Sequence, residues 1–354
     1  MTGLTGVIAS DRAARLPASA RKIRPPYALD PSMTFYSPQE NVEALGHPRV
    51  AAWLGFVAQH WTPTAVPGTH RRLALLLPCT KYKPYPTSRE HRAVNAALLA
   101  AGWRPVGGRG TGPAPALLAV LDDGEDPAVL DVSPLVRDGV VLDRFVVSEP
   151  LGLVPYEHTA LWRGEQAPAA SYDDPGLFES RGTSVSPDRP DCTAVPLAGG
   201  RWRWGPAERA AYARMHAAMV GVLVTALGRL GPSYDATAAW VSPGLTHVSF
   251  LADRARRAAD GLPTARRGPD GPIPLEGVLD RLPGALDLMP TRAQLAEARE
   301  ALAARLARQG RPAGPGAVRS VFARGDGNDT PLGLPEALAH LVGWLDEHAG
   351  GGQA

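Results

Sequence analysis

Residues 73–91, Leu-Ala-Leu-Leu-Leu-Pro-Cys-Thr-Lys-Tyr-Lys-Pro-Tyr-Pro-Thr-Ser-Arg-Glu-His, indicate what kind of fold this chain adopts. The continuous apolar run from Leu73 to Leu77 lies between basic residues and a proline, which is the pattern of a buried strand. Residues 89–101 have helical character and end at Gly102. Ligands of open α/β sheets gather beyond the carboxyl ends of the strands, where such strand-to-helix turns lie. We therefore expect a functional site on this turn.

The turn itself concentrates reactive side chains. Of the 37 basic residues in the chain only three are lysines, and two of these, Lys81 and Lys83, stand here beside Cys79; the third is Lys22. Arginine keeps its proton at working pH, whereas lysine releases it when it is desolvated. Because the chain uses arginine for almost every other positive charge, two lysines at this place indicate that the amine itself is needed.

The remaining segments extend the α/β pattern. Short apolar runs predict further strands at 117–121, 144–148 and 236–241. Apolar spacing and end signals predict helices over 49–61, 206–230, 291–310 and 335–348. We expect an α/β fold with a mainly parallel central sheet flanked by helices, and a C-terminal helical extension. The expected divisions are a flexible leader at 1–28, an α/β catalytic core at 29–260, a Pro- and Gly-rich linker at 261–290 and the extension at 291–354.

Composition narrows the class of protein. With 354 residues, 44% of them hydrophobic, the chain can bury a large core in one domain or two. A formal net charge of +2 does not suit a protein that coats nucleic acid along its whole length. Cys79 and Cys192 alone make no disulfide framework, so we expect a reduced, cytoplasmic protein with no secretory signal and no membrane segment. Neither metal-ligand spacing nor a phosphate-binding loop is evident, since the Gly-rich stretch 107–112 lacks the following lysine, and we expect no cofactor.

The turn also carries a spaced motif, which consists of Pro-Cys, three residues, Lys-Pro-Tyr, two residues, Ser, two residues and His. Its positions are filled by Pro78, Cys79, Lys83, Pro84, Tyr85, Ser88 and His91. In this motif the chain resembles the archaeosine synthase alpha-subunit family, which is related to tRNA-guanine transglycosylases. Ser148 with the following Pro-Leu-Gly-Leu-Val-Pro at 150–155, and a looser element around 195–202, continue the resemblance.

The resemblance implies an activity in the modification of 7-deazaguanine bases. Members of the family act on 7-cyano-7-deazaguanine in tRNA: the nitrile carbon receives the amine of free lysine and becomes an amidine adduct, which a partner enzyme cleaves. The implied ligands are therefore a 7-deazaguanine base, in tRNA, in another nucleic acid or free, and lysine or another amine donor. The larger members also carry a transglycosylase-like region and an RNA-binding module. This chain is too short for that arrangement, so the core chemistry carries over better than the tRNA substrate does.

The motif suggests three catalytic residues. A thiolate can attack a nitrile carbon to give a thioimide, and Cys79 is the candidate nucleophile; Lys83 and the N-terminus of the following helix favour its thiolate. A lone cysteine after a buried strand is also a common small core residue, so an inert thiol remains an alternative. Lys83 is expected to bind an anion, pair with a carboxylate or act as a base. His91 is expected to shuttle protons, although a lone histidine is often structural.

The residues expected to bind substrate are Pro78, Tyr85, Ser88, Ser148, Gly152 and Glu157. Tyr85 either stacks on a base or plugs the sheet, and Ser88 is also a natural N-cap of the predicted helix. Ser148 and Glu157 are polar candidates on an opposite wall of the site. Gly152 in that wall indicates a close backbone approach or a positive φ.

Two other functions fit the same residues. One is a non-catalytic module that binds nucleic acid or a modified base, and the other is a base-excising or base-exchanging hydrolase related to glycosylases. A basic cluster could hold phosphates, but in so arginine-rich a chain a solvated face explains it more simply. The members of this cluster are Arg254, Arg256, Arg257, Arg266 and Arg267.

Overall fold

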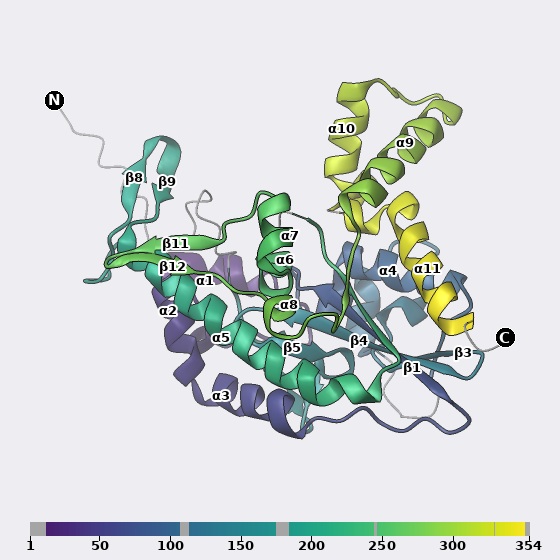
Figure 1. Ribbon diagram of the computed structural model, residues 1–354, viewed down its shortest axis with the longest axis horizontal. Coiled ribbons are helices and arrows are strands. Elements are labelled where there is room, and N and C mark those ends of the chain that lie inside the picture. The colour runs from purple at the N-terminus through teal and green to yellow at the C-terminus, as the bar shows by residue number, and fades with distance from the viewer. Residues whose placement is uncertain (1–11, 107–112, 175–183, 244–245, 329, 351–354) are drawn as a thin grey trace.

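In the computed structural model the described residues are 12–106, 113–174, 184–243, 246–328 and 330–350, and all structural statements concern these. Their centre is a seven-stranded sheet of mixed direction (Figure 1). Four strands run parallel in the order β13 (Asp287–Met289), β10 (Ala236–Trp240), β1 (Arg71–Pro78) and β4 (Val140–Ser148). Three antiparallel strands complete the sheet: β3 (Leu135–Arg137) and β5 (Gly152–Pro155) pair with β4, and β2 (Arg104–Pro105) pairs with β3. The expected α/β class with mostly parallel strands is confirmed.

The predicted apolar run, residues 73–77, forms the central part of β1. Leu73, Leu75, Leu76 and Leu77 are fully buried, because β1 has a neighbour on each edge and packed side chains on each face. Its last residue, Pro78, lies opposite Val147 of β4, so Cys79 emerges beside the end of β4. The Cys79 N–H donates to the Val147 carbonyl at 3.1 Å and extends this pairing by one residue.

The helices follow the predicted ranges closely. Residues 49–61 form α3 (Pro48–Gly55) and a continuing π-helical turn (Phe56–His60), and α4 (Arg89–Ala100) follows the motif. The long helix α5 (Pro206–Leu230) is as predicted and lies across the molecule beside β5 (Figure 1). The segment Pro206–Ser233, which contains α5, is long and apolar enough to cross a membrane. However, 61% of its apolar window is buried against other parts of the fold, as in a core helix. The other short elements are α2 (Pro38–Glu43), α6 (Thr246–Leu251), α7 (Arg254–Ala259) and the pairs β6 (Leu161–Trp162) with β7 (Glu165–Gln166) and β8 (Val195–Leu197) with β9 (Arg201–Arg203).

The strand predicted at 117–121 is wrong. Residues Pro115–Val120 form a 3-10 helix instead, and Leu118 is exposed. A five-residue apolar run does not by itself distinguish a strand from a helical turn, and here the preceding prolines favour the turn. The predicted strand at 144–148 is the carboxyl half of β4.

The two ends of the expected core are not separate from it. From Arg12 onward the expected leader contains α1 (Arg12–Ala20), and Ile23 forms a parallel bridge with Lys83. The expected linker holds the hairpin β11 (Ala265–Gly268) and β12 (Gly271–Pro274), then α8 (Val278–Arg281) and the sheet strand β13. The helical extension is present as α9 (Arg292–Arg308), α10 (Pro315–Ala323) and α11 (Pro335–Gly350), and α9 begins with the predicted capping box.

Candidate active site

The parallel strands β1, β4 and β10 all end at the same edge of the sheet, and the chain leaves them with polar residues. Cys79 follows β1, Ser148 ends β4 and is followed by Glu149, and the segment after β10 leads into α6, which carries His247. The carboxyl edge of an open α/β sheet is the usual place for a ligand site. Residues from three segments thus meet at one sheet edge.

The central feature of this edge is a thiol next to an imidazole. Cys79 Sγ lies 3.1 Å from His247 Nε2, and the Cys79 side chain is partly exposed. A cysteine beside a histidine is the arrangement by which enzymes activate a thiol nucleophile. His247 was missed in the sequence, although one signal was available: it lies in the segment that follows the predicted strand 236–241.

Burial keeps this pair neutral at rest. It raises the pKa of the Cys79 thiol to about 12, against the opposing influence of Lys83, and lowers the pKa of His247 to about 4. The thiol therefore donates its proton to Nε2, and Nδ1 carries the ring proton. That buried Nδ1 has no hydrogen-bond partner among the described residues. In the resting protein the proton therefore stays on the Cys79 sulfur.

Lys83 lies within electrostatic reach of Cys79 and is only 2% exposed. Its Nζ lies 4.4 Å from the centre of the Tyr172 ring and 3.8 Å from Asp173 Oδ1. Burial lowers the pKa of Lys83, while Asp173 and then Cys79 act in the opposite direction. The expectation that Lys83 belongs to the site and not to a solvated surface agrees with this burial.

Three buried hydroxyl groups next to the turn form a triangle of hydrogen bonds. Tyr85 Oη lies 2.8 Å from Ser148 Oγ and 2.7 Å from Tyr172 Oη, and Ser148 Oγ lies 2.6 Å from Tyr172 Oη. Burial raises the pKa of both phenols, so they are neutral. Tyr85 is fully buried and offers no open ring face, which favours the plug over the stacking platform. Ser148 ties the second motif to the first through this triangle.

His91 is fully buried at the start of α4, and both its ring nitrogens are occupied. Nε2 lies 2.8 Å from the carbonyl oxygen of Pro78, so Nε2 carries the proton and donates it. Nδ1 then accepts from the Tyr156 hydroxyl at 3.1 Å. Burial lowers the pKa of His91 to about 4. Instead of facing the thiol as a proton shuttle, His91 holds the peptide group that precedes Cys79.

The other expected residues divide into two groups. Ser88 caps α4, accepting from the His91 N–H at 3.2 Å, and Gly152 has the positive φ of +68° that was expected. A Cβ on Gly152 would lie 2.8 Å from Val222 Cγ1, so the close approach is also confirmed. Glu157 does not join the site, because β5 runs back along β4 and places it beyond Phe145, where it accepts from Trp61 Nε1 at 2.9 Å.

A carboxyl group outside the expected set lies nearer to Cys79. Glu149 directly follows Ser148, is 7% exposed and accepts from Asn41 Nδ2 at 2.7 Å. Burial, and then the charge of Asp174, raise the pKa of Glu149, and Glu149 in turn contributes to the raised pKa of Cys79. Burial and the nearby charge of Asp174 thus both favour the protonated form of Glu149, which lies within electrostatic reach of the thiol.

The basic cluster is largely used inside the fold. Arg256 pairs with Asp260 at 2.8 Å, and Arg257, which is fully buried, pairs with Asp280 at 3.4 Å. Arg266 lies over the Tyr212 ring. These contacts argue against a single phosphate-binding surface made by the cluster.

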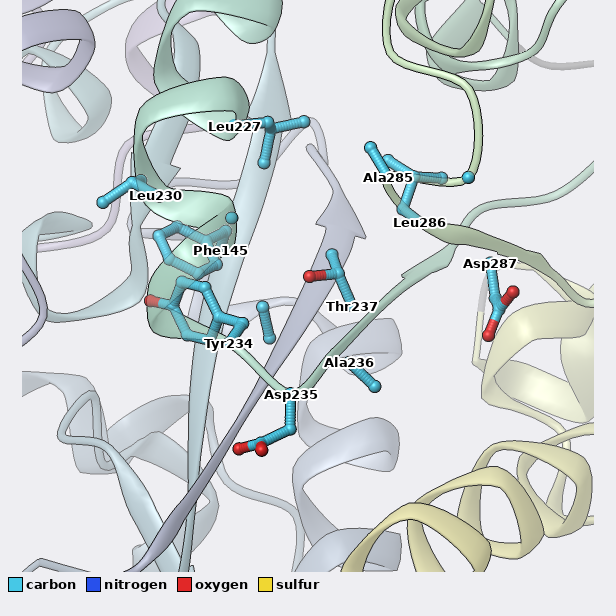
Figure 2. Close-up of a pocket in the computed structure, with 13 residues that line it drawn as sticks. Phe145, Leu227, Leu230, Tyr234, Asp235, Ala236, Thr237, Ala285, Leu286 and Asp287 are labelled. Atoms are coloured by element: carbon cyan, nitrogen blue, oxygen red, sulfur yellow. The ribbon is translucent and has the colours of Figure 1, made fainter.

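A cavity of about 340 Å³ lies at the other end of the sheet (Figure 2). Its wall includes Tyr234, Asp235, Thr237 and Asp287, from the amino-terminal ends of β10 and β13. Cysteine, histidine and lysine do not occur among its lining residues. It is thus separate from the thiol–imidazole pair and has no comparable chemistry.

Comparison of the chain with protein-family models, with curated proteins and with solved structures finds no match.

Proposed function

We propose that this protein is an amidine-forming enzyme that joins an amine, such as lysine, to the nitrile carbon of a 7-cyano-7-deazaguanine base. The observation that supports it most is the Cys79–His247 pair, with 3.1 Å between Sγ and Nε2, beside the buried amine of Lys83. The mainly parallel sheet, with helices on its flanks, would serve as the scaffold that presents this pair. The identity of the base is inferred from the motif resemblance, and the reaction is inferred from the Cys79–His247 pair.

In the first step Cys79 Sγ forms a bond to the nitrile carbon while His247 Nε2 takes the thiol proton. The imidazolium returns this proton to the nitrile nitrogen, which leaves a neutral thioimide and a neutral imidazole. Because burial disfavours both the thiolate and the imidazolium, the charged pair exists only briefly. His91 assists from a distance by fixing the Pro78 carbonyl and thus the backbone of Cys79.

In the second step the amine attacks the thioimide carbon, a carbon–nitrogen bond forms and the carbon–sulfur bond breaks. Lys83, in the deprotonated form that burial favours, accepts the proton that the amine loses, and this proton returns to the departing Cys79 sulfur. Nitrile and amine thus combine into an amidine with no other product. Lys83 suits this part because burial lowers its pKa.

The test is to incubate the protein with the cyano base, free and in tRNA, with and without lysine, and to follow protein and product by mass spectrometry. Without amine we expect a covalent adduct of the whole base on Cys79, since addition to a nitrile releases nothing. Cys79→Ala should abolish adduct and product, and His247→Gln should slow adduct formation at least about tenfold. Cys192→Ser is the matched control and should react like the unmodified chain.

Other outcomes support the other functions. Tight binding of modified RNA that survives Cys79→Ala, without any product, indicates the binding module. Release of free base from RNA indicates the base-excising hydrolase. The absence of an amidine product with every acceptor and several amines would overturn the proposal.

The acceptor is proposed to be a base within a polynucleotide, on account of the β8–β9 hairpin. Arg201 and Arg203 stand on one face of β9 and are exposed, and within the described chain neither side chain has an ion-pair partner. The hairpin projects from the body next to β11 and β12 (Figure 1). Free arginines on a projecting hairpin suit phosphate groups, and the RNA reaction should therefore weaken with added salt while the free-base reaction does not.

A further inference from the structure

Two of the three lysines of this chain meet at one carboxylate. Lys22 Nζ donates to both oxygens of Asp173, at 2.9 Å to Oδ1 and 2.7 Å to Oδ2. Lys83 Nζ lies 3.8 Å from Oδ1, which is beyond hydrogen-bond distance. Asp173 is fully buried, Lys83 is 2% exposed, and the Lys22 side chain is 24% exposed. The partly exposed Lys22 thus makes the hydrogen bonds to Asp173, and the buried Lys83 makes none to it.

The backbone keeps the three residues together. The Lys83 N–H donates to the Lys22 carbonyl at 3.0 Å, and the Arg24 N–H donates to the Lys83 carbonyl at 2.8 Å. Asp173 is anchored in the same way, since its N–H donates to the Met33 carbonyl at 3.1 Å. The main chain therefore fixes the positions from which the two lysine side chains reach Asp173.

We propose that Lys22 is a positioning residue that occupies Asp173 and so leaves the Lys83 amine free to give up its proton and act as the base of the amine-transfer step. This inference rests on the proposed function for the role of the base, but the arrangement itself can be measured without any reaction. It also gives a role to the contact between the end of the expected leader, at Lys22 to Arg24, and Lys83 of the motif.

The charges around Lys83 give the sign of the effect. Burial acts first and lowers its pKa; Asp173, Cys79 and Asp174 raise it, and Lys22 lowers it. Tyr85 and Tyr172, which also face this region, are neutral phenols. Removal of Lys22 takes away one nearby positive charge and releases both Asp173 oxygens toward Lys83. Both changes stabilise the ammonium, so the pKa of Lys83 must rise.

The small number of lysines makes a direct measurement possible. Protein labelled with ¹³C- and ¹⁵N-lysine gives three side-chain signals, which Lys22→Met and Lys81→Arg assign by subtraction. We expect the Lys83 signal to titrate about one pH unit higher in Lys22→Met than in the unmodified chain. Lys22→Arg keeps a two-pronged hold on Asp173 and should leave the titration of Lys83 where it was. Lys81→Arg, at an exposed position, is the control for labelling and folding.

Several outcomes separate this inference from the proposed function. An unchanged Lys83 titration in folded Lys22→Met overturns the inference, and a loss of thermal stability without that shift assigns Lys22 a purely structural role. If Lys22→Met does not fold, Lys22→Gln replaces it with the same expectation. A shifted titration in a protein that forms no amidine upholds the electrostatic arrangement and rejects the proposed reaction. In an active protein, kcat of Lys22→Met should fall near neutral pH and recover at higher pH, with KM little changed.

Discussion

Cys79 and His247 have pKa values that burial moves apart, and this decides when the thiol reacts. A raised thiol pKa means that the thiolate appears only as the pH approaches about 12, while a lowered imidazole pKa leaves His247 neutral down to about pH 4. Between these limits both groups are thus neutral, with the proton on the sulfur. A permanent thiolate, as the motif alone suggested through Lys83 and the helix N-terminus, is not what the surroundings favour.

We therefore predict that Cys79 of the resting protein is a slow target for iodoacetamide. In a Cys192→Ser background the rate at pH 8 should be at least about tenfold below that of free cysteine, because the free thiol has a pKa near ~8.5. The rate should rise with pH without reaching a plateau before about pH 11. The measurement is alkylation followed by mass spectrometry over a pH series.

A plateau below pH 8 in that series would show that Cys79 is a resting thiolate, and the neutral pair would then be wrong. Cys79→Ser in the same background gives the rate of nonspecific modification. Circular dichroism at each pH separates thiol ionisation from unfolding.

The strand β5 lies beside the end of β4 at the site, and its path depends on one glycine. Gly152 begins β5 opposite Ser148, with a φ of +68° and Val222 of α5 directly above it. Both features were inferred from the sequence as alternatives, and both are present. A side chain at this position would strain the turn by which β5 runs back along β4 next to Ser148.

Gly152→Ala should accordingly destabilise the protein by about 2 to 4 kcal/mol. A positive φ costs a residue with a Cβ about 1 kcal/mol or more, and the contact with Val222 adds an overpacking term of similar size. The measurement is urea denaturation of the variant and of the unmodified chain. The double variant Gly152→Ala, Val222→Ala should recover part of the contact term, but it also loses buried methyl groups of Val222.

A stability loss below about 0.5 kcal/mol in Gly152→Ala would contradict the close approach. The matched control is Gly164→Ala, which also has a positive φ, of +81°, but has no atom within 4 Å of the added Cβ. It should show the backbone cost alone, and the difference between the two variants measures the packing against α5.

Among the described residues, the C-terminal helices share the main hydrophobic core with the sheet, although the sequence suggests a core with an appended extension. Leu302 of α9 and Leu341 of α11 are fully buried in the same hydrophobic core as Leu75 of β1. Trp240 Nε1 at the end of β10 donates to the Leu332 carbonyl at 3.2 Å, which ties the C-terminal helices to a sheet strand. Removal of these helices would expose apolar surface of the sheet domain.

We predict that a chain ending at Pro290 does not fold on its own. The intact chain should melt in a single cooperative transition by circular dichroism and calorimetry, with no separate transition for residues 291–354. A dispersed NMR spectrum from the shortened chain, with Cys79 as slow to alkylate as in the intact protein, would contradict this and restore a separable extension.

The sequence predicted long elements with clear end signals better than it predicted short ones. α5 and α4 were predicted nearly to the residue, because they have many turns of periodic pattern and clear end signals. The region 115–120 was wrong because five apolar residues suit either a strand or a helical turn. The Pro- and Gly-rich stretch 261–290 resembles a linker, yet it supplies β13 to the sheet. This strand was not predicted, because a three-residue edge strand leaves almost no pattern in the sequence.

Short stretches of the chain were enough to predict the buried strand β1, the turn that carries Cys79 and Lys83, and the helix capped by Ser88, because an apolar run, a proline and a capping serine are local signals. Folding in three dimensions determined that His247, 168 residues away, is the imidazole beside the thiol, and that Lys22 holds Asp173. Strand pairing sets those distances and burial sets the pKa values, and neither can be obtained from local spacing.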